Sequence, residues 1–120
     1  MDRKIQKRSC RAIRCLPFNS SFYNAIQKDG ITAKKVFIEK DKYVANGFVW
    51  FKNADQVERS FCWLITIGIL RREVDGQGLT AKVRITPLGK EILGRHPQLP
   101  NEKATYIERM RTWASRKVLN

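Results

Sequence analysis

The fold of this chain is decided by residues 53–94, which read NADQVERSFCWLITIGILRREVDGQGLTAKVRITPLGKEILG. The stretch begins with a predicted helix, because Asn53 or Asp55 can cap its start and Gly68 suits the position just past a helix end. Apolar side chains recur at helical spacing and predict its buried side: Val57, Phe61, Leu64 and Ile65. The residues between them are expected to point elsewhere: Gln56, Arg59, Ser60 and Trp63.

A β-hairpin is predicted directly after this helix. Residues 69–74 have the composition of a strand, residues 75–78 have turn chemistry, and residues 79–85 alternate as a half-buried strand does. Thr86 and Pro87 then supply an N-cap followed by a proline in the first turn, which opens another helix. The stretch therefore predicts two helices joined through a hairpin.

Helical signals continue toward the N-terminus. Residues 1–16 contain neither glycine nor proline and predict a basic amphipathic helix that Pro17 ends. Asn19 and Thr32 are good N-caps, so a helix is expected after each of them. Residues 42–52 favour a short hairpin or strand instead, because they are rich in β-formers and contain an Asn-Gly pair.

The composition narrows the classes of protein. The chain has 120 residues, 42% of them hydrophobic, which is enough for one core. Its 24 Lys+Arg against 11 Asp+Glu give a formal charge of +13, which predicts a polyanionic partner. The bases fall into four runs, at residues 1–16, 28–42, 71–90 and 101–120. Six Phe, three Tyr and three Trp argue against a disordered chain.

Membrane and secreted classes are not favoured. The most apolar stretch, residues 61–70, is about half as long as a membrane-spanning helix. No apolar segment of a secretory signal follows the basic N-terminus, and three cysteines cannot form a complete disulfide framework. We therefore expect a reduced, cytoplasmic protein without a membrane partner.

The motifs of residues 53–94 carry a family resemblance. The residues concerned are Gly68, Ile69, Leu70, Arg71, Arg72, Val83, Ile85, Thr86, Leu88, Gly89 and Lys90. In these the chain resembles the winged-helix DNA-binding domains, most closely the MarR-like and PadR-like regulators. The resemblance implies a mainly α fold with a small β-hairpin wing (α+β), a winged helix-turn-helix with additional N- and C-terminal helices. It divides the chain into a basic N-terminal helix (1–16), a winged-helix domain (17–96) and a C-terminal helix (101–120).

The resemblance implies that the protein binds duplex DNA. It also implies a transcriptional regulator that is associated with the nucleoid. Phosphate contacts are expected from the wing and from the N-terminal helix: Arg71, Arg72, Lys82 and Arg84, with Arg3, Lys4, Lys7, Arg8 and Arg11. The candidate base readers, in the first turns of the helix after Asn53, are Gln56, Arg59 and Ser60. Glutamine can bond adenine bidentately, and arginine can bond guanine.

A stripe of apolar residues marks the C-terminal helix. Its members at helical spacing include Ile107, Met110, Trp113 and Val118. In MarR-like proteins the terminal helices build the dimer, so the resemblance implies a homodimer through this stripe. The same stripe could instead pack on the helix's own domain.

Two other functions stay open at this stage. The chain could be a basic module that binds RNA or belongs to a ribonucleoprotein, in which case an exposed Trp63 would matter more than the wing. It could also be a winged helix that binds only protein, in which case the terminal apolar stripe would matter most.

The sequence indicates neither a catalytic site nor a metal site. Cys10, Cys15, Cys62 and His96 could form a Cys₃His zinc set on paper, but structural thiols in helices are the better account. His96 is the only histidine, and no motif supplies it with a nucleophile. We expect neither an enzyme, nor a metal, nor a cofactor.

Overall fold

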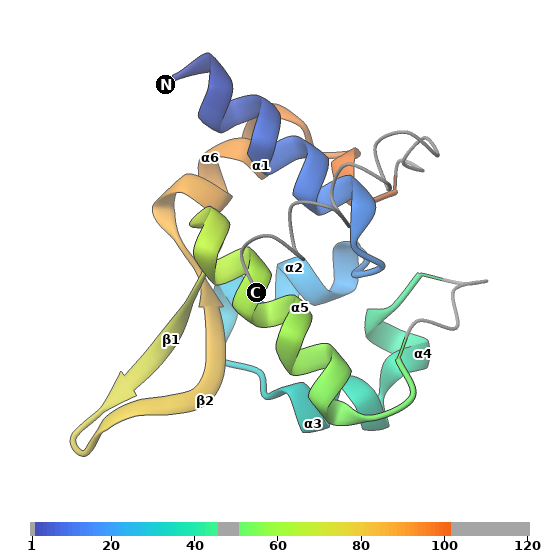
Figure 1. Ribbon diagram of the computed structural model, residues 1–120, viewed down its shortest axis with the longest axis vertical. Coiled ribbons are helices and arrows are strands. Elements are labelled where there is room, and N and C mark those ends of the chain that lie inside the picture. The colour runs from blue at the N-terminus through green and yellow to red at the C-terminus, as the bar shows by residue number, and fades with distance from the viewer. Residues whose placement is uncertain (1, 46–50, 102–120) are drawn as a thin grey trace.

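The computed structural model describes residues 2–45 and 51–101, and over these residues the protein is mainly helical with an antiparallel two-stranded sheet (Figure 1). This confirms the predicted α+β class. The elements are α1 (Arg3–Cys15), α2 (Ser20–Lys28), α3 (Ala33–Ile38), α4 (Lys40–Tyr43), α5 (Ala54–Ile67), β1 (Leu70–Asp75), β2 (Gly78–Ile85), α6 (Pro87–Arg95) and the 3₁₀ turn η1 (Leu99–Asn101).

Four helices begin at the capping residues that the sequence indicates. Asn19, Thr32, Asn53 and Thr86 each accept a hydrogen bond from the backbone N–H three residues later, at 3.0–3.1 Å. Gly68 ends α5 with a φ of 96°, in the left-handed region that favours glycine. Local capping chemistry therefore sets these boundaries.

The hairpin is tied to the rest of the fold by a third segment. β1 and β2 pair antiparallel, with Leu70 opposite Ile85. Ile31, just before α3, forms an isolated bridge to β2: its N–H donates to the Val83 carbonyl at 3.2 Å and its carbonyl accepts from the Val83 N–H at 2.9 Å. The bridge holds the start of α3 beside the hairpin.

Aromatic rings form the centre of the core. Phe18 stacks on Phe22 with 4.5 Å between ring centroids, and Phe61 lies 5.7 Å from each of them. Phe51 joins from the segment before α5, 5.6 Å from Phe18. Burial of these rings holds α2 and α5 together.

α5 is covered on more sides than the sequence predicts. Ser60 and Trp63 are only 2% and 5% exposed, so the prediction that they point away from the buried side is wrong. The reason is that α5 packs against α1, α3 and β1, and a helix with three neighbours buries more than one stripe. Ile65, predicted to be buried, is half-buried.

The expectation of extended structure from residue 42 is also wrong at its start. Tyr43 closes the short helix α4 and is buried, and the Val44 N–H donates to the Lys40 carbonyl at 2.9 Å. Val44 then forms an isolated bridge with Phe18. The Asn-Gly pair of this segment lies outside the described residues.

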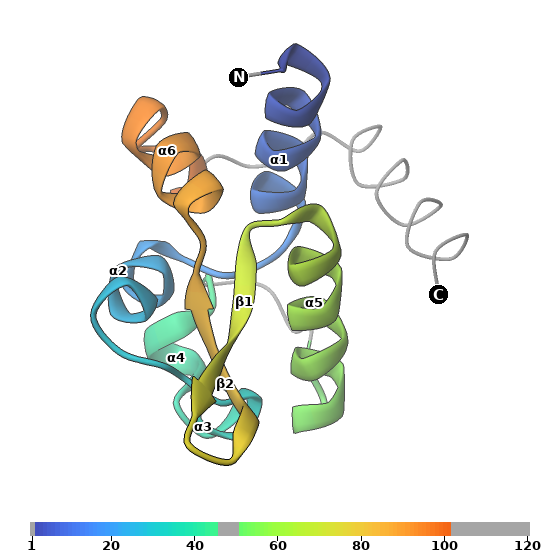
Figure 2. The same ribbon diagram turned by 90° about the vertical axis from the view of Figure 1, so that its left-hand side faces the viewer.

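Several of the described elements gather at two opposite ends of the molecule (Figures 1 and 2). α1 and α6 lie at one end, and α3, the first turn of α5 and the hairpin tip lie at the other. We call the exposed surface of α3, the first turns of α5 and the hairpin the hairpin face, and that of α1 the α1 face. No helix in the described ranges is long and apolar enough to cross a membrane.

Candidate nucleic-acid interface

Arg72, an expected phosphate contact, anchors the hairpin to α5. Its guanidinium pairs with the Glu58 carboxylate on α5 and donates to the Ala81 carbonyl of β2 at 3.1 Å. The Arg72 side chain is half-buried between these partners. The Arg72 guanidinium therefore stabilises the packing of the hairpin on α5. The sequence alone did not indicate this structural role.

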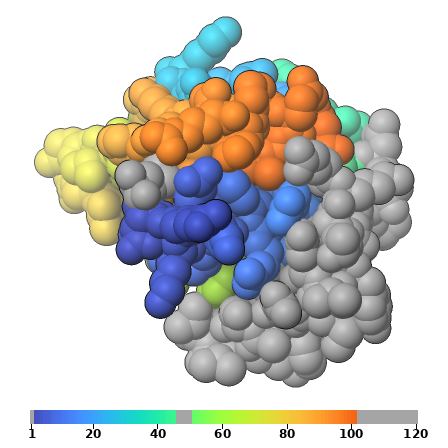
Figure 3. Space-filling view, turned by 90° about the horizontal axis from the view of Figure 1, so that it is seen from above, coloured from blue at the N-terminus to red at the C-terminus, as the bar shows by residue number. Residues whose placement is uncertain are grey.

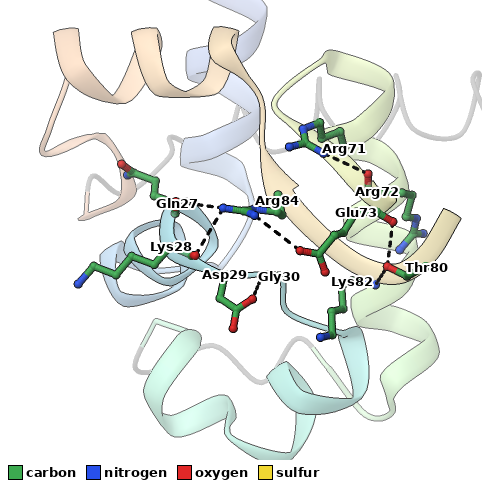
Figure 4. Close-up of polar contacts among 10 residues, drawn as sticks. All are labelled: Gln27, Lys28, Asp29, Gly30, Arg71, Arg72, Glu73, Thr80, Lys82 and Arg84. Atoms are coloured by element: carbon green, nitrogen blue, oxygen red, sulfur yellow. Dashed lines mark hydrogen bonds and ion pairs between the residues drawn. The ribbon is translucent and has the colours of Figure 1, made fainter. Parts of the chain in front are cut away.

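Arg84 has a similar structural role on the other side of the hairpin. Figure 4 shows its guanidinium aimed at the end of α2, where it lies 3.5 Å from the Gln27 carbonyl and 3.4 Å from the Lys28 carbonyl. It also faces the Glu73 carboxylate at 3.6 Å. Cations suit the carbonyls at a helix C-terminus, so Arg84 stabilises the junction of α2 and β2.

Arg71 and Lys82 are the exposed bases of the hairpin. In Figure 4 the Lys82 side chain extends from β2 toward the loop before α3. A Cβ on Gly30, in that loop, would lie 2.9 Å from the Lys82 Cβ, so the two segments are closely packed. Lys82 therefore adds its charge to the surface that α3 also forms.

Two lysines that the sequence did not single out belong to the same face. Lys34 and Lys35 lie in the first turn of α3 and are exposed. The bridge between Ile31 and Val83 brings this turn next to the hairpin. In the sequence these lysines are visible only as part of the basic run 28–42. Their position beside the hairpin depends on the contact between Ile31 and Val83, which are about fifty residues apart in the sequence.

The first turns of α5 present one free candidate base reader. Gln56 Oε1 accepts from the Lys52 N–H at 2.7 Å while the Gln56 N–H donates to Asn53 Oδ1, so this side chain is engaged in the helix cap. Ser60 is buried and cannot reach a base. Arg59 is exposed and has no hydrogen bond or ion pair with other described residues.

The tip of the hairpin is apolar and acidic rather than basic. Val74 and Leu79 pair across the strands and are 62% and 75% exposed. Asp75, directly after Val74, accepts from the Gln77 N–H at 2.7 Å through its Oδ1. Phosphate contacts by the hairpin are therefore expected along its flank, where Arg71 and Lys82 lie, and not at its tip.

The N-terminal bases lie on the α1 face. Arg3, Lys4, Lys7 and Arg8 are exposed on α1, and Arg11 is half-buried. Figures 1 and 2 show α1 at the end opposite the hairpin tip, and Figure 3 shows it exposed beside α6. These bases therefore lie far along the molecule from the hairpin tip.

The cysteines do not assemble with other ligands in the part of the chain that the structure describes. Within it, no three His, Cys, Asp or Glu side chains group closely enough to hold a metal ion. Cys15 is buried, and Cys62 is exposed on α5 with its Sγ 3.8 Å from Arg72 Nη2.

These features define a small, basic, mainly helical α+β protein with a hairpin packed beside a helical core. Residues 1–116 match the family described as Npun_F0494-like, and the chain belongs to this family. No curated protein and no solved structure matched the chain.

The anchoring role of Arg72 leads to a stability prediction. Arg72→Ala is expected to lower the free energy of unfolding by about 1–2 kcal/mol, because it leaves Glu58 and the Ala81 carbonyl without their partner. The midpoint of thermal denaturation should fall by about 5–10 °C. The control is Arg71→Ala, an exposed neighbour expected to change stability by less than about 0.5 kcal/mol. Equal losses in both variants would contradict the anchor.

Proposed function

We propose that this protein is a winged-helix protein that binds duplex DNA as a transcriptional regulator, with α5 as the recognition helix and β1–β2 as the wing. The observation that carries the proposal is the bridge between Ile31 and Val83, which joins α3 and the hairpin into one face with the first turns of α5. A helix pair with a hairpin alongside is the arrangement that a winged helix presents to DNA. The insertion of α4 and the residues after it is a departure from the short turn of that family.

The charge of the hairpin face supports a nucleic-acid partner. It carries five exposed bases within the described residues: Lys34, Lys35, Arg59, Arg71 and Lys82. The chain has a net charge of +13, and binding of such a surface to phosphates releases counterions. In this proposal the lysines and Arg71 contact phosphates, and Arg59 contacts a base edge.

The proposal is tested by fluorescence anisotropy with duplex DNA, single-stranded DNA and duplex RNA of one sequence. Duplex DNA is expected to bind tightest. With about five phosphates neutralised, log K should fall with log salt at a slope of roughly −4 to −5. A preference for RNA or single strands would favour the ribonucleoprotein alternative. Absence of nucleic-acid binding would favour the second candidate, protein binding, for which the exposed pair Val74 and Leu79 offers an apolar contact.

The proposal includes a homodimer and association with the nucleoid. The dimer would use the apolar stripe of the C-terminal helix, whose members lie outside the described residues: Ile107, Met110, Trp113 and Val118. Sedimentation equilibrium of the full chain is expected to give a dimer at tens of micromolar, and Met110→Lys should give a monomer. A monomeric full chain would contradict the dimer and favour packing of the stripe on its own domain.

A further inference from the structure

A pocket of about 430 Å³ lies on the α1 face. Its lining includes four bases that recur every three or four residues along α1: Arg3, Lys7, Arg11 and Arg14. Gln6 and His96 also line it, with Gln6 Nε2 3.2 Å from His96 Nε2. This contact joins α1 to the end of α6, and the volume is that of a small-molecule site.

Three of the pocket bases, Arg3, Lys7 and Arg11, have no carboxylate partner among the described residues. No Asp or Glu is among the pocket's described lining residues. Like charges three or four residues apart on a helix repel each other, so this arrangement destabilises α1. A multivalent anion in the pocket would offset that repulsion.

The side chains around the pocket favour phosphate over an apolar ligand. Its described lining has four basic side chains and contains no Phe, Tyr, Trp, Val, Leu or Ile. Guanidinium groups bind phosphate oxygens through paired hydrogen bonds. The row of bases from residue 3 to residue 11 spans about 12 Å along the helix, which is long enough to hold more than one phosphate group.

We propose that this pocket binds a free small ligand that carries a diphosphate or triphosphate chain. The phosphodiester backbone of a nucleic acid offers the same chemistry, but a double helix cannot enter a pocket of this size and would touch only its rim. Six of its described lining residues belong to α1, and this helix lies at the end of the molecule opposite the hairpin tip (Figures 1 and 2). The site is thus separate from the proposed DNA surface, and it does not depend on that surface being correct.

Isothermal titration of the full chain with inorganic tripolyphosphate tests the proposal. Saturable binding of one equivalent is expected at 0.15 M salt, at least about tenfold tighter than binding of orthophosphate. Arg3→Gln combined with Lys7→Gln should weaken tripolyphosphate binding by about 30-fold or more, because two charge-assisted hydrogen bonds are lost. Both residues are exposed, so the fold should persist.

The matched control is Lys4→Gln combined with Arg8→Gln. It removes the same charge from exposed positions of the same helix, outside the pocket lining. Its effect should be less than about threefold, since Lys4 and Arg8 do not line the pocket and would make no direct hydrogen bond to the anion. Equal losses in the two double variants, or no saturable binding to the unmodified chain, would overturn the proposal.

Duplex DNA is titrated with the same variants to separate the two sources of phosphate. Arg3→Gln with Lys7→Gln is expected to leave duplex affinity within about threefold of the unmodified chain. If this variant weakens duplex binding while tripolyphosphate binding is unchanged, the pocket is a contact for the nucleic-acid backbone and the proposal of a free ligand is wrong.

Discussion

Gly89→Ala is expected to destabilise the protein by about 2–3 kcal/mol, which is a large part of the stability of a small domain. A Cβ at this position would lie 2.7 Å from Ile85 Cγ1 and 2.8 Å from the Ile69 carbonyl oxygen. The side chain of Ile85 can move, but the backbone carbonyl of Ile69 cannot do so without disturbing the start of β1. The free energy of unfolding is measured by urea denaturation followed by circular dichroism.

Gly94→Ala is the control for this prediction. Gly94 lies in the same helix, α6, and a Cβ there would have no atom within 4 Å. Alanine has the higher helix propensity, so this variant should be more stable by up to about 1 kcal/mol. Opposite signs for the two substitutions would confirm that close packing of α6 on the hairpin, and not helix propensity, requires Gly89. Equal effects would contradict it.

The helices and the hairpin whose ends are set by neighbouring residues could be predicted from the sequence. The caps at Asn19, Thr32 and Thr86 act within four residues, so their chemistry is readable without the fold. The hairpin was predictable for the same reason, because turn residues and alternation lie next to each other in the chain. Gly68 likewise marked the end of α5.

Features that depend on distant contacts could not be predicted. Trp63 and Ser60 are buried because α5 has three packing neighbours, and no pattern within α5 states how many neighbours it has. Arg72 looked like a surface base until its partner Glu58, fourteen residues away, was located. Tyr43 is helical although its surroundings favour strand, because the turn of α4 buries its ring.

The candidate sites also combine features that are local in the sequence with features that depend on distant contacts. The basic runs could be identified from the sequence. The side of the molecule on which each run lies could not be predicted from it. Lys34 and Lys35 join the hairpin face through the bridge from Ile31 to Val83, and His96 reaches the pocket on α1 although ninety residues separate it from Gln6. The polyanionic partner therefore stays a prediction from the charge, and the fold shows that the described basic runs lie on two different surfaces.

Replacing the three lysines Lys34, Lys35 and Lys82 with glutamine is expected to weaken duplex DNA binding about 100-fold, because each lost phosphate contact costs about 1 kcal/mol. The slope of log K against log salt should become shallower by about 2.7, since three fewer counterions are displaced. All three residues are exposed, so circular dichroism should show an intact fold. The measurement is a salt series of anisotropy titrations on one duplex.

The matched control replaces Lys4, Arg8 and Lys90 with glutamine, which removes the same charge from exposed residues of α1 and α6. Because these helices lie at the end opposite the hairpin tip, the control should weaken binding by less than about threefold, through residual long-range attraction alone. Equal losses in the two triple variants would mean that binding depends on total charge, as for an architectural protein wrapped by DNA. If only the control variant loses affinity for duplex DNA, the interface lies on the α1 face instead. The sequence analysis expected Lys4 and Arg8 of that face to contact phosphates.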